Sequence, residues 1–307
     1  MKRSILFILF FSILLLGACT TTAETPAAVS DAAPEVQSEE ETEVMAAETV
    51  VAETVVAATA VPTATQPAPT EAPTIAPTPE PVETEEPVIL GEIVSEDIVV
   101  EAADGLELAA TFYAADGLEN APAILLLHML GSNRTIWETV GLVDELTAKG
   151  YAVLALDMRG HGETGNAQDW VLAEDDIQRV WHYFVDRPEV DAGRTAVIGA
   201  SIGSNMALIA AANEPTMRTA ILLSPGLVYR GVSTEDRMPD YGERPLLIVA
   251  SEDDYYSEDS AHKLAETAVG ETQVQIYEKA GHGTDMFEPQ PDLTPLILDW
   301  LATHLGN

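Results

Sequence analysis

The stretch Thr195-Ala196-Val197-Ile198-Gly199-Ala200-Ser201-Ile202-Gly203 decides the prediction of the fold. Its apolar first half predicts a buried strand, and a helical pattern follows from Ile202 to about Ala212. Between them stands Gly-x-Ser-x-Gly, whose glycines permit a strained turn that lifts the serine hydroxyl above a sheet. We therefore expect Ser201 to be a nucleophile, with the Ile202 amide as one donor to an oxyanion; a plain tight turn with an exposed serine is the alternative.

Apolar strands and helices alternate on both sides of this stretch, which predicts an α/β fold with a mostly parallel, doubly wound sheet. Ligands of such sheets bind at the carboxyl ends of the strands. The strands expected are 98–101, 106–112, 123–127, 152–157, 195–199, 220–223, 246–250 and 274–277. The helices expected are 136–149, 169–184, 202–212, 260–269 and 293–305.

A serine needs a base to take its proton and an acid to orient that base, and in this arrangement the acid and then the base follow the serine along the chain. His282 lies in a glycine-flanked loop after a strand, whereas His262 and His304 lie inside predicted helices. We therefore expect His282 to be the base. The acid should lie in the loop after strand 246–250, where the sequence reads Ser251-Glu252-Asp253-Asp254, and the residues alone leave three carboxylates open.

Further motifs stand in the same order as in a known family. Asp157-Met158-Arg159-Gly160-His161-Gly162 follows one strand, His128-Met129-Leu130-Gly131 follows another, and Gly281-His282-Gly283 comes last. Together with the Gly-x-Ser-x-Gly turn, this resembles the α/β-hydrolase superfamily over nearly all of 93–307. Within it the chain is similar to serine esterases of the dienelactone-hydrolase-like or small-esterase kind. Dienelactone hydrolases proper carry a cysteine nucleophile, so Ser201 points to ester hydrolysis in general.

The resemblance selects an acid. The acidic loop is similar to the Gly-x-x-Asp loop of the family, with Ser251 in the place of the glycine, and this implies Asp254 as the third member of the triad. Asp253 is the alternative, and Glu252 comes third.

The resemblance also supplies a second oxyanion donor. His128-Met129-Leu130 is similar to the His-Gly-x loops of serine hydrolases, with Met129 in the place of glycine, and it implies that the backbone amide of Leu130 is the donor. The backbone amide of Met129 is the alternative donor. His128 is expected to be structural. Arg159 and His161 are expected to brace loops through hydrogen bonds, with direct contact to the substrate as the alternative.

The insertion after strand 220–223 runs from about Pro225 to Arg244, some twenty residues, which implies a short cap and an open site. Tyr229, Met238 and Tyr241 are either acyl-pocket residues or surface residues of this cap. An open site suits small or short-acyl esters, cleaved through an acyl-enzyme. A peptidase, thioesterase or lactonase with the same triad remains open, as does a non-catalytic binding lipoprotein that retains the fold.

The first eighteen residues resemble a bacterial lipoprotein signal peptide. Lys2 and Arg3 precede the apolar run Ile5–Leu16, which is too short to span a membrane, since about 20 apolar residues are needed. Leu16-Gly17-Ala18-Cys19 is similar to a lipobox, so we expect lipidation of Cys19, a membrane anchor and a place in the bacterial cell envelope outside the cytoplasm. Ordinary cleavage beside an incidental cysteine is the alternative.

Residues 19–91 are rich in Ala, Thr, Pro and Glu and contain no aromatic residue, Lys or Arg. Eight prolines lie between Pro62 and Pro87, and they disfavour helices and favour extended backbone. With few large apolar side chains to bury, this segment is expected to be a disordered linker. Residues 92–307 then form a single hydrolase domain.

Composition excludes several classes of function. The chain has 14 Lys and Arg against 51 Asp and Glu, a formal charge of −37, which disfavours nucleic acid as a partner because phosphates require clustered cations. A single cysteine excludes a disulfide framework, and the histidines lack metal-ligand spacing. No phosphate-binding or dinucleotide-binding glycine loop is present, so no cofactor is expected. The sequence leaves the oligomeric state open.

Overall fold

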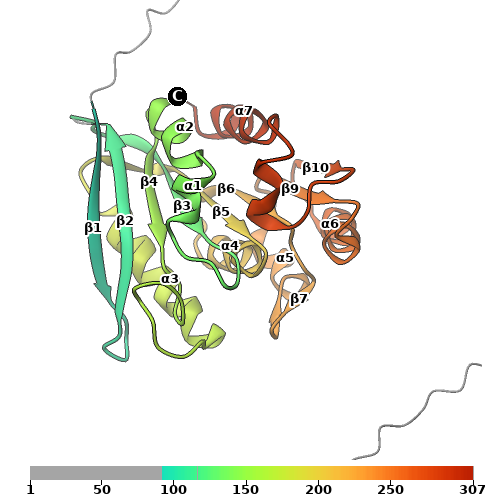
Figure 1. Ribbon diagram of the computed structural model, residues 1–307, viewed down its shortest axis with the longest axis horizontal. Helices are drawn as coiled ribbons and strands as arrows, with labels where there is room; N and C mark the ends of the chain where they lie inside the picture. The colour runs from blue at the N-terminus through green and yellow to red at the C-terminus, as the bar shows by residue number, and fades with distance from the viewer. Residues whose placement is uncertain (1–91, 116, 307) are drawn as a thin grey trace, which may run out of the picture. The chain divides into compact units, whose positions relative to one another are not determined.

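A computed structural model describes residues 92–115 and 117–306 (Figure 1). The predictions that concern residues 1–91, namely the signal peptide, the lipidation of Cys19 and the linker, lie outside the described residues. Within 92–115 and 117–306, no helix has both the length and the apolar character required to cross a membrane.

The core of the domain is an eight-stranded sheet in the order β1-β2-β4-β3-β5-β6-β9-β10. Six neighbouring strands of this sheet, β4, β3, β5, β6, β9 and β10, run parallel to one another. Strand β2 pairs antiparallel with both β1 and β4. This confirms the predicted mostly parallel sheet. The strands are β1 Ile93–Glu101, β2 Glu107–Ala115, β3 Ala121–Leu127, β4 Ala152–Leu156, β5 Val190–Ala200, β6 Met217–Leu223, β9 Leu246–Ser251 and β10 Thr272–Tyr277.

Helices cover both faces of the sheet (Figure 1), because the central strands are apolar on both sides. In β3, Ile124 and Leu126 pack into one core and Leu125 and Leu127 into the other. The first core includes α1 Ile136–Thr139, α2 Leu142–Ala148 and α7 Leu293–Leu305. The second core includes α3 Trp170–Val185, α4 Ile202–Asn213, α5 Met238–Tyr241 and α6 Tyr255–Thr267.

The prediction of one continuous helix after β3 is wrong. The sequence predicts a single helix over 136–149, but the structure divides it into α1 and α2. The division falls at Gly141, which has φ +77° and precedes the first residue of α2. A left-handed residue cannot continue a right-handed helix, and glycine adopts that conformation at little cost.

The short cap lies between β6 and β9, as expected. It contains the hairpin β7 Val228–Tyr229 and β8 Val232–Ser233, the turn of 3-10 helix Glu235–Arg237, and α5. Of the three residues considered for an acyl pocket, Met238 and Tyr241 are buried in the second core instead. The Tyr241 hydroxyl accepts from the Ala220 amide at 3.0 Å and donates to the Pro245 carbonyl, so this side chain holds the cap to β6.

Candidate active site

The turn between β5 and α4 has the strained geometry that its glycines predict. Ser201 has φ +54° and ψ −123°, a region that non-glycine residues seldom occupy. A Cβ atom on Gly199 would lie 2.0 Å from the Gly203 carbonyl oxygen, and one on Gly203 would lie 2.3 Å from that of Leu127. Only glycine fits at either position, and the turn brings Ser201 beside the end of β3.

The structure brings two of the predicted triad residues into direct contact. His282, in the loop after β10, places Nδ1 2.6 Å from Oδ2 of Asp254. Asp254 is the N-cap of α6, where its Oδ1 accepts from the Ser257 amide at 3.4 Å. Since a carboxylate accepts, the imidazole donates through Nδ1, and its Nε2 is left as the basic nitrogen.

The neighbouring carboxylate, Asp253, has different partners. Its Oδ1 accepts from the Gly281 amide at 3.2 Å and from the Ser251 hydroxyl. The hydrogen bond from Ser251 is the main cause that lowers the pKa of Asp253 below its usual value. The Ser251 hydroxyl oxygen in turn accepts from the Ala280 amide at 2.8 Å. Asp253 therefore braces the backbone that carries His282, whereas Asp254 contacts the imidazole itself.

The loop of His282 lies against the turn that carries Ser201. The amide of Gly283 donates to the Ser224 hydroxyl at 2.8 Å, and a Cβ atom on Gly283 would lie 3.6 Å from that of Ala200. Among the described residues, no hydrogen bond joins the Ser201 hydroxyl to His282. Hydrogen bonds of this kind are commonly long in a free enzyme and shorten when substrate binds.

His128 orients the loop that was expected to bind the oxyanion. Its Nε2 accepts from the Met158 amide at 3.1 Å, so Nδ1 carries the proton and donates to the Met129 carbonyl at 2.8 Å. In a trans peptide the carbonyl and the following amide point in opposite directions. The Leu130 N–H therefore points away from His128. Within 92–115 and 117–306, neither this amide nor that of Ile202 donates a hydrogen bond, so both are available to a ligand.

Burial keeps His128 uncharged. The side chain is fully buried, and loss of solvation lowers its pKa to about 4. At neutral pH the ring therefore keeps the single proton that its two hydrogen bonds require. This agrees with the structural role expected from the sequence.

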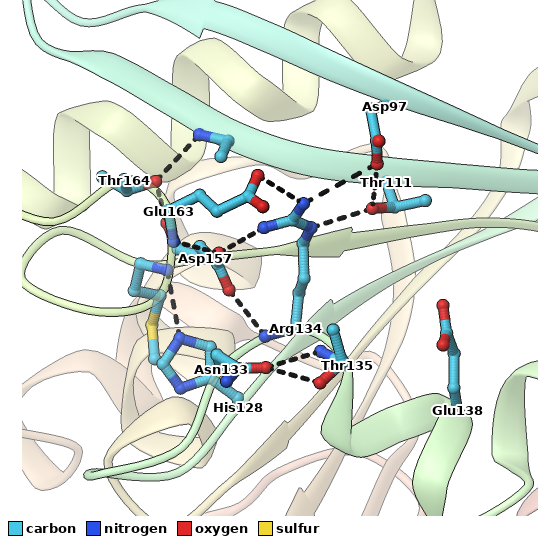
Figure 2. Close-up of polar contacts among 12 residues, drawn as sticks. Asp97, Thr111, His128, Asn133, Arg134, Thr135, Glu138, Asp157, Glu163 and Thr164 are labelled. Atoms are coloured by element: carbon cyan, nitrogen blue, oxygen red, sulfur yellow. Dashed lines mark hydrogen bonds and ion pairs between the residues drawn. The ribbon is translucent and has the colours of Figure 1, made fainter.

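A buried ionic network fixes the other end of the same loop (Figure 2). The Arg134 amide donates to Oδ1 of Asp157 at 2.6 Å, and its guanidinium bonds Oδ2 of the same carboxylate. The guanidinium also donates to Thr111 on β2 and to Glu163, at 2.8 Å each. Asp157 is 1% exposed and also accepts from the Glu163 amide at 2.8 Å. One arginine thus ties the loop after β3 to the turn after β4 and to the antiparallel edge of the sheet. We refer to Arg134, Asp157, Thr111 and Glu163 as the Arg134 network.

Arg159 and His161 brace loops, as expected. The Arg159 guanidinium donates to Asp176 on α3 at 2.7 and 2.8 Å and to Asp104 at 2.7 and 3.1 Å. These carboxylates, Asp176 first, raise the pKa of Arg159. Nδ1 of His161 lies 3.1 Å from the Arg159 carbonyl, and its ring packs edge-on to His128 at 4.9 Å between centroids.

Sequence reasoning missed three residues that position this site. Arg134 is one, and its signal is an isolated arginine between the His128 loop and a helix. Asn205 is another: one helical turn after Ser201, its fully buried side chain donates to the Val232 carbonyl and accepts from the Gly226 amide, each at 3.0 Å. The third is Tyr256, whose hydroxyl is bonded to the backbone of Val228. The sequence around Asn205 and around Tyr256 contains no motif that marks either residue as part of the site.

The order of strands, the elbow at Ser201 and the loops after β3, β9 and β10 together form an α/β-hydrolase fold. Residues 119–240 match the family model described as "Serine aminopeptidase, S33". In sequence, the chain is 31% identical to monoacylglycerol lipase abhd6-B of Xenopus laevis over 113 residues, which cover 36% of this chain and 32% of the relative.

Solved structures agree on the fold. An acetyl xylan esterase from Paenibacillus sp. R4 superposes with a TM-score of 0.60 at 20% identity, covering 72% of this chain and 87% of that one. Dienelactone hydrolase from Anabaena variabilis superposes with a TM-score of 0.58 at 18% identity, covering 69% and 99%. The chain spans less than half the length of the curated relatives that it matches.

Proposed function

We propose that this chain is a serine hydrolase that cleaves small or short-acyl carboxylic esters through a triad of Ser201, His282 and Asp254. The observation that carries the proposal is the 2.6 Å contact between His282 and Asp254, in a loop packed against the strained turn of Ser201. The match to a serine hydrolase family and the fold shared with esterases support the same class.

In this mechanism the Ser201 hydroxyl oxygen attacks the ester carbonyl carbon while His282 Nε2 takes its proton. The carbonyl oxygen becomes an oxyanion, which accepts from the amides of Leu130 and Ile202. As the tetrahedral intermediate collapses, the bond to the alcohol oxygen breaks and His282 returns the proton to that oxygen. Water then attacks the acyl-enzyme by the same route. Asp254 accepts the hydrogen bond from Nδ1 throughout and stabilises the imidazolium.

The two adjacent carboxylates allow a matched test of the triad. Asp254→Asn should lower kcat for ester hydrolysis about 10³- to 10⁴-fold, because the amide carries no charge and can donate to Nδ1, which favours the wrong tautomer of the imidazole. Asp253→Asn should lower it by less than about tenfold, since this side chain bonds only backbone and Ser251. Circular dichroism checks that both variants fold. A larger loss for Asp253→Asn would transfer the acid role to that residue.

A peptidase is the second candidate, favoured by the description of the matching family model. The same triad can cleave an amide, thioester or lactone, and the substrate pocket decides among them. Comparing kcat/KM for acetate esters with that for aminoacyl amides separates these activities. A non-catalytic binding protein that retains the fold would show neither activity.

We also propose that the chain is anchored in a bacterial envelope membrane through a lipid on Cys19, on the strength of the lipobox-like sequence before that residue. Cys19→Ser should release the protein from the membrane fraction. Membrane association that persists in this variant would contradict the anchor.

A further inference from the structure

The mechanism proposed above decides on which side of His282 the alcohol part of the ester must lie. His282 delivers a proton to the alcohol oxygen as the bond to carbon breaks, so that oxygen must lie beside the imidazole. One flank of the His282 loop is already filled: Thr284 Oγ1 lies 3.4 Å from the sulfur of Met129, in the loop of the proposed oxyanion donors. The alcohol must therefore lie on the other flank, which faces the cap.

That flank is lined by aromatic side chains. The Tyr229 ring meets His282 edge-on, with centroids 6.3 Å apart, and meets Tyr256 at 5.4 Å. Tyr256 is 45% exposed and Val228 50%, and Tyr255, the first residue of α6 directly after Asp254, is 79% exposed. Tyr229 and Tyr256 thus lead from the proposed base to the surface, and Tyr255 follows the proposed acid in the chain. We refer to Val228, Tyr229, Tyr255 and Tyr256 as the tyrosine rim.

The tyrosine rim is held in place before any ligand arrives. The hairpin β7–β8 lies beside α6 (Figure 1), and the Tyr256 hydroxyl accepts from the Val228 amide at 2.9 Å and donates to its carbonyl at 3.0 Å. The Tyr229 hydroxyl shares a 2.9 Å hydrogen bond with Ser257. A surface already ordered loses little conformational entropy when a ligand binds. Exposed rings in a fixed position therefore suit the flat face of another ring.

The charges around the rim select against anions. Glu252 and Asp253 precede Tyr255 and are exposed, and Glu258 follows it. Lys263 on the same helix is bound to Asp259 at 2.5 Å. Arg230, at the tip of the cap hairpin, lines a hollow of about 400 Å³ together with Trp170 of α3 and Ile209 of α4. An anionic alcohol at the rim would thus meet net negative charge.

From these contacts we infer that the tyrosine rim is the subsite for the alcohol part of the substrate, and that it takes an uncharged ring-shaped alcohol. The shared chemistry is a flat apolar ring face, which both an aryl group and a neutral pyranose sugar present. The inference rests on the proposed function, since it takes His282 as the proton donor to the departing alcohol.

The test uses four acetate esters: phenyl acetate, an acetylated methyl glucoside, the corresponding anionic uronate, and ethyl acetate as the reference without a ring. Tyr255→Ala should raise KM for the neutral ring esters about three- to tenfold relative to ethyl acetate, as expected for the loss of one aromatic contact. The wild-type protein should prefer the glucoside to the uronate, and salt should reduce that preference. Tyr183→Ala, which changes a partly exposed tyrosine on α3, is the matched control.

The possible results identify the ring that binds, and they separate failure of the subsite inference from failure of the proposed function. An effect of Tyr255→Ala on phenyl acetate alone, or on the glucoside alone, identifies which ring the subsite takes. Equal KM changes for all four esters, the same ratios in Tyr183→Ala, or a preference for the uronate would overturn the inference. If ethyl and phenyl acetate are not hydrolysed at all, the proposed function fails, and the subsite falls with it.

Discussion

The two sides of the active site are held by different kinds of interaction. On the side of the Leu130 amide, the loop is fixed by a buried ion pair, Arg134 with Asp157, and by an uncharged buried histidine, His128. On the side of the cap, the hairpin is fixed by neutral groups, chiefly Asn205 and the hydroxyl of Tyr256. The first side therefore depends on the charge state of its residues, whereas the contacts of Asn205 and Tyr256 with the hairpin do not; the ion pair between Arg237 and Glu174 holds another part of the cap.

This difference predicts how mutation and acid should destabilise each side of the active site. Removing one partner of a buried ion pair leaves an uncompensated charge, which costs more than the loss of a neutral hydrogen bond. Acid should likewise act on the His128 side and leave the contacts of Asn205 intact.

Arg134→Met should lower the free energy of unfolding by about 3–5 kcal/mol, because it leaves the Asp157 carboxylate buried and unpaired. It should also lower kcat more than it raises KM, since the Leu130 amide acts on the oxyanion and not on bound substrate. Urea denaturation and steady-state kinetics measure the two effects.

Arg159→Met is the matched control, because Arg159 is equally buried and pairs with Asp176 away from the loop of Leu130. It should destabilise the fold by a similar amount with a smaller loss of kcat. Equal losses of kcat in the two variants would show that Arg134 supports the fold alone.

Acid should weaken the fold through His128. Its folded-state pKa of about 4 lies below the unfolded value, so the unfolded chain binds the proton first as pH falls. The contribution of His128 to stability is complete above about pH 6.5 and is lost progressively down to about pH 4, by roughly 3 kcal/mol. Denaturation curves between pH 6.5 and 5 measure the slope.

His128→Gln should remove this component of the slope, while His182→Gln, at an exposed histidine on α3, should keep it. The same slope in wild type and His128→Gln would mean that another group causes the acid sensitivity.

Asn205→Ala should cost about 1–3 kcal/mol, because it leaves the Gly226 amide and the Val232 carbonyl without their partner. Since no charge is involved, the cost should be the same at pH 5 and pH 7. A strong pH dependence of this cost would contradict the distinction between the two sides.

Much of the fold could be predicted from local patterns. The apolar runs of β3, β5 and β9 and the glycines around Ser201 are local features, and local features determined those elements correctly. The break at Gly141 was missed because a single glycine inside an apolar helical pattern is compatible with a continuous helix.

The site was predictable in part for the same reason. Ser201 and His282 stand in glycine-marked loops, whereas the choice between Asp253 and Asp254 depends on which way each side chain points, and adjacent residues in a loop give no sign of that. The Arg134 network and the contacts of Asn205 join residues that are distant in the chain, so they appear only when the strands are assembled.

The central claim is that Ser201 is the nucleophile, and the most direct test is to label the protein with a fluorophosphonate and map the modified peptide by mass spectrometry. We expect one label, on Ser201, which is absent in Ser201→Ala and still forms in Asp253→Asn. A label on another residue, a label that persists in Ser201→Ala, or no label under conditions in which a control serine esterase reacts would contradict it.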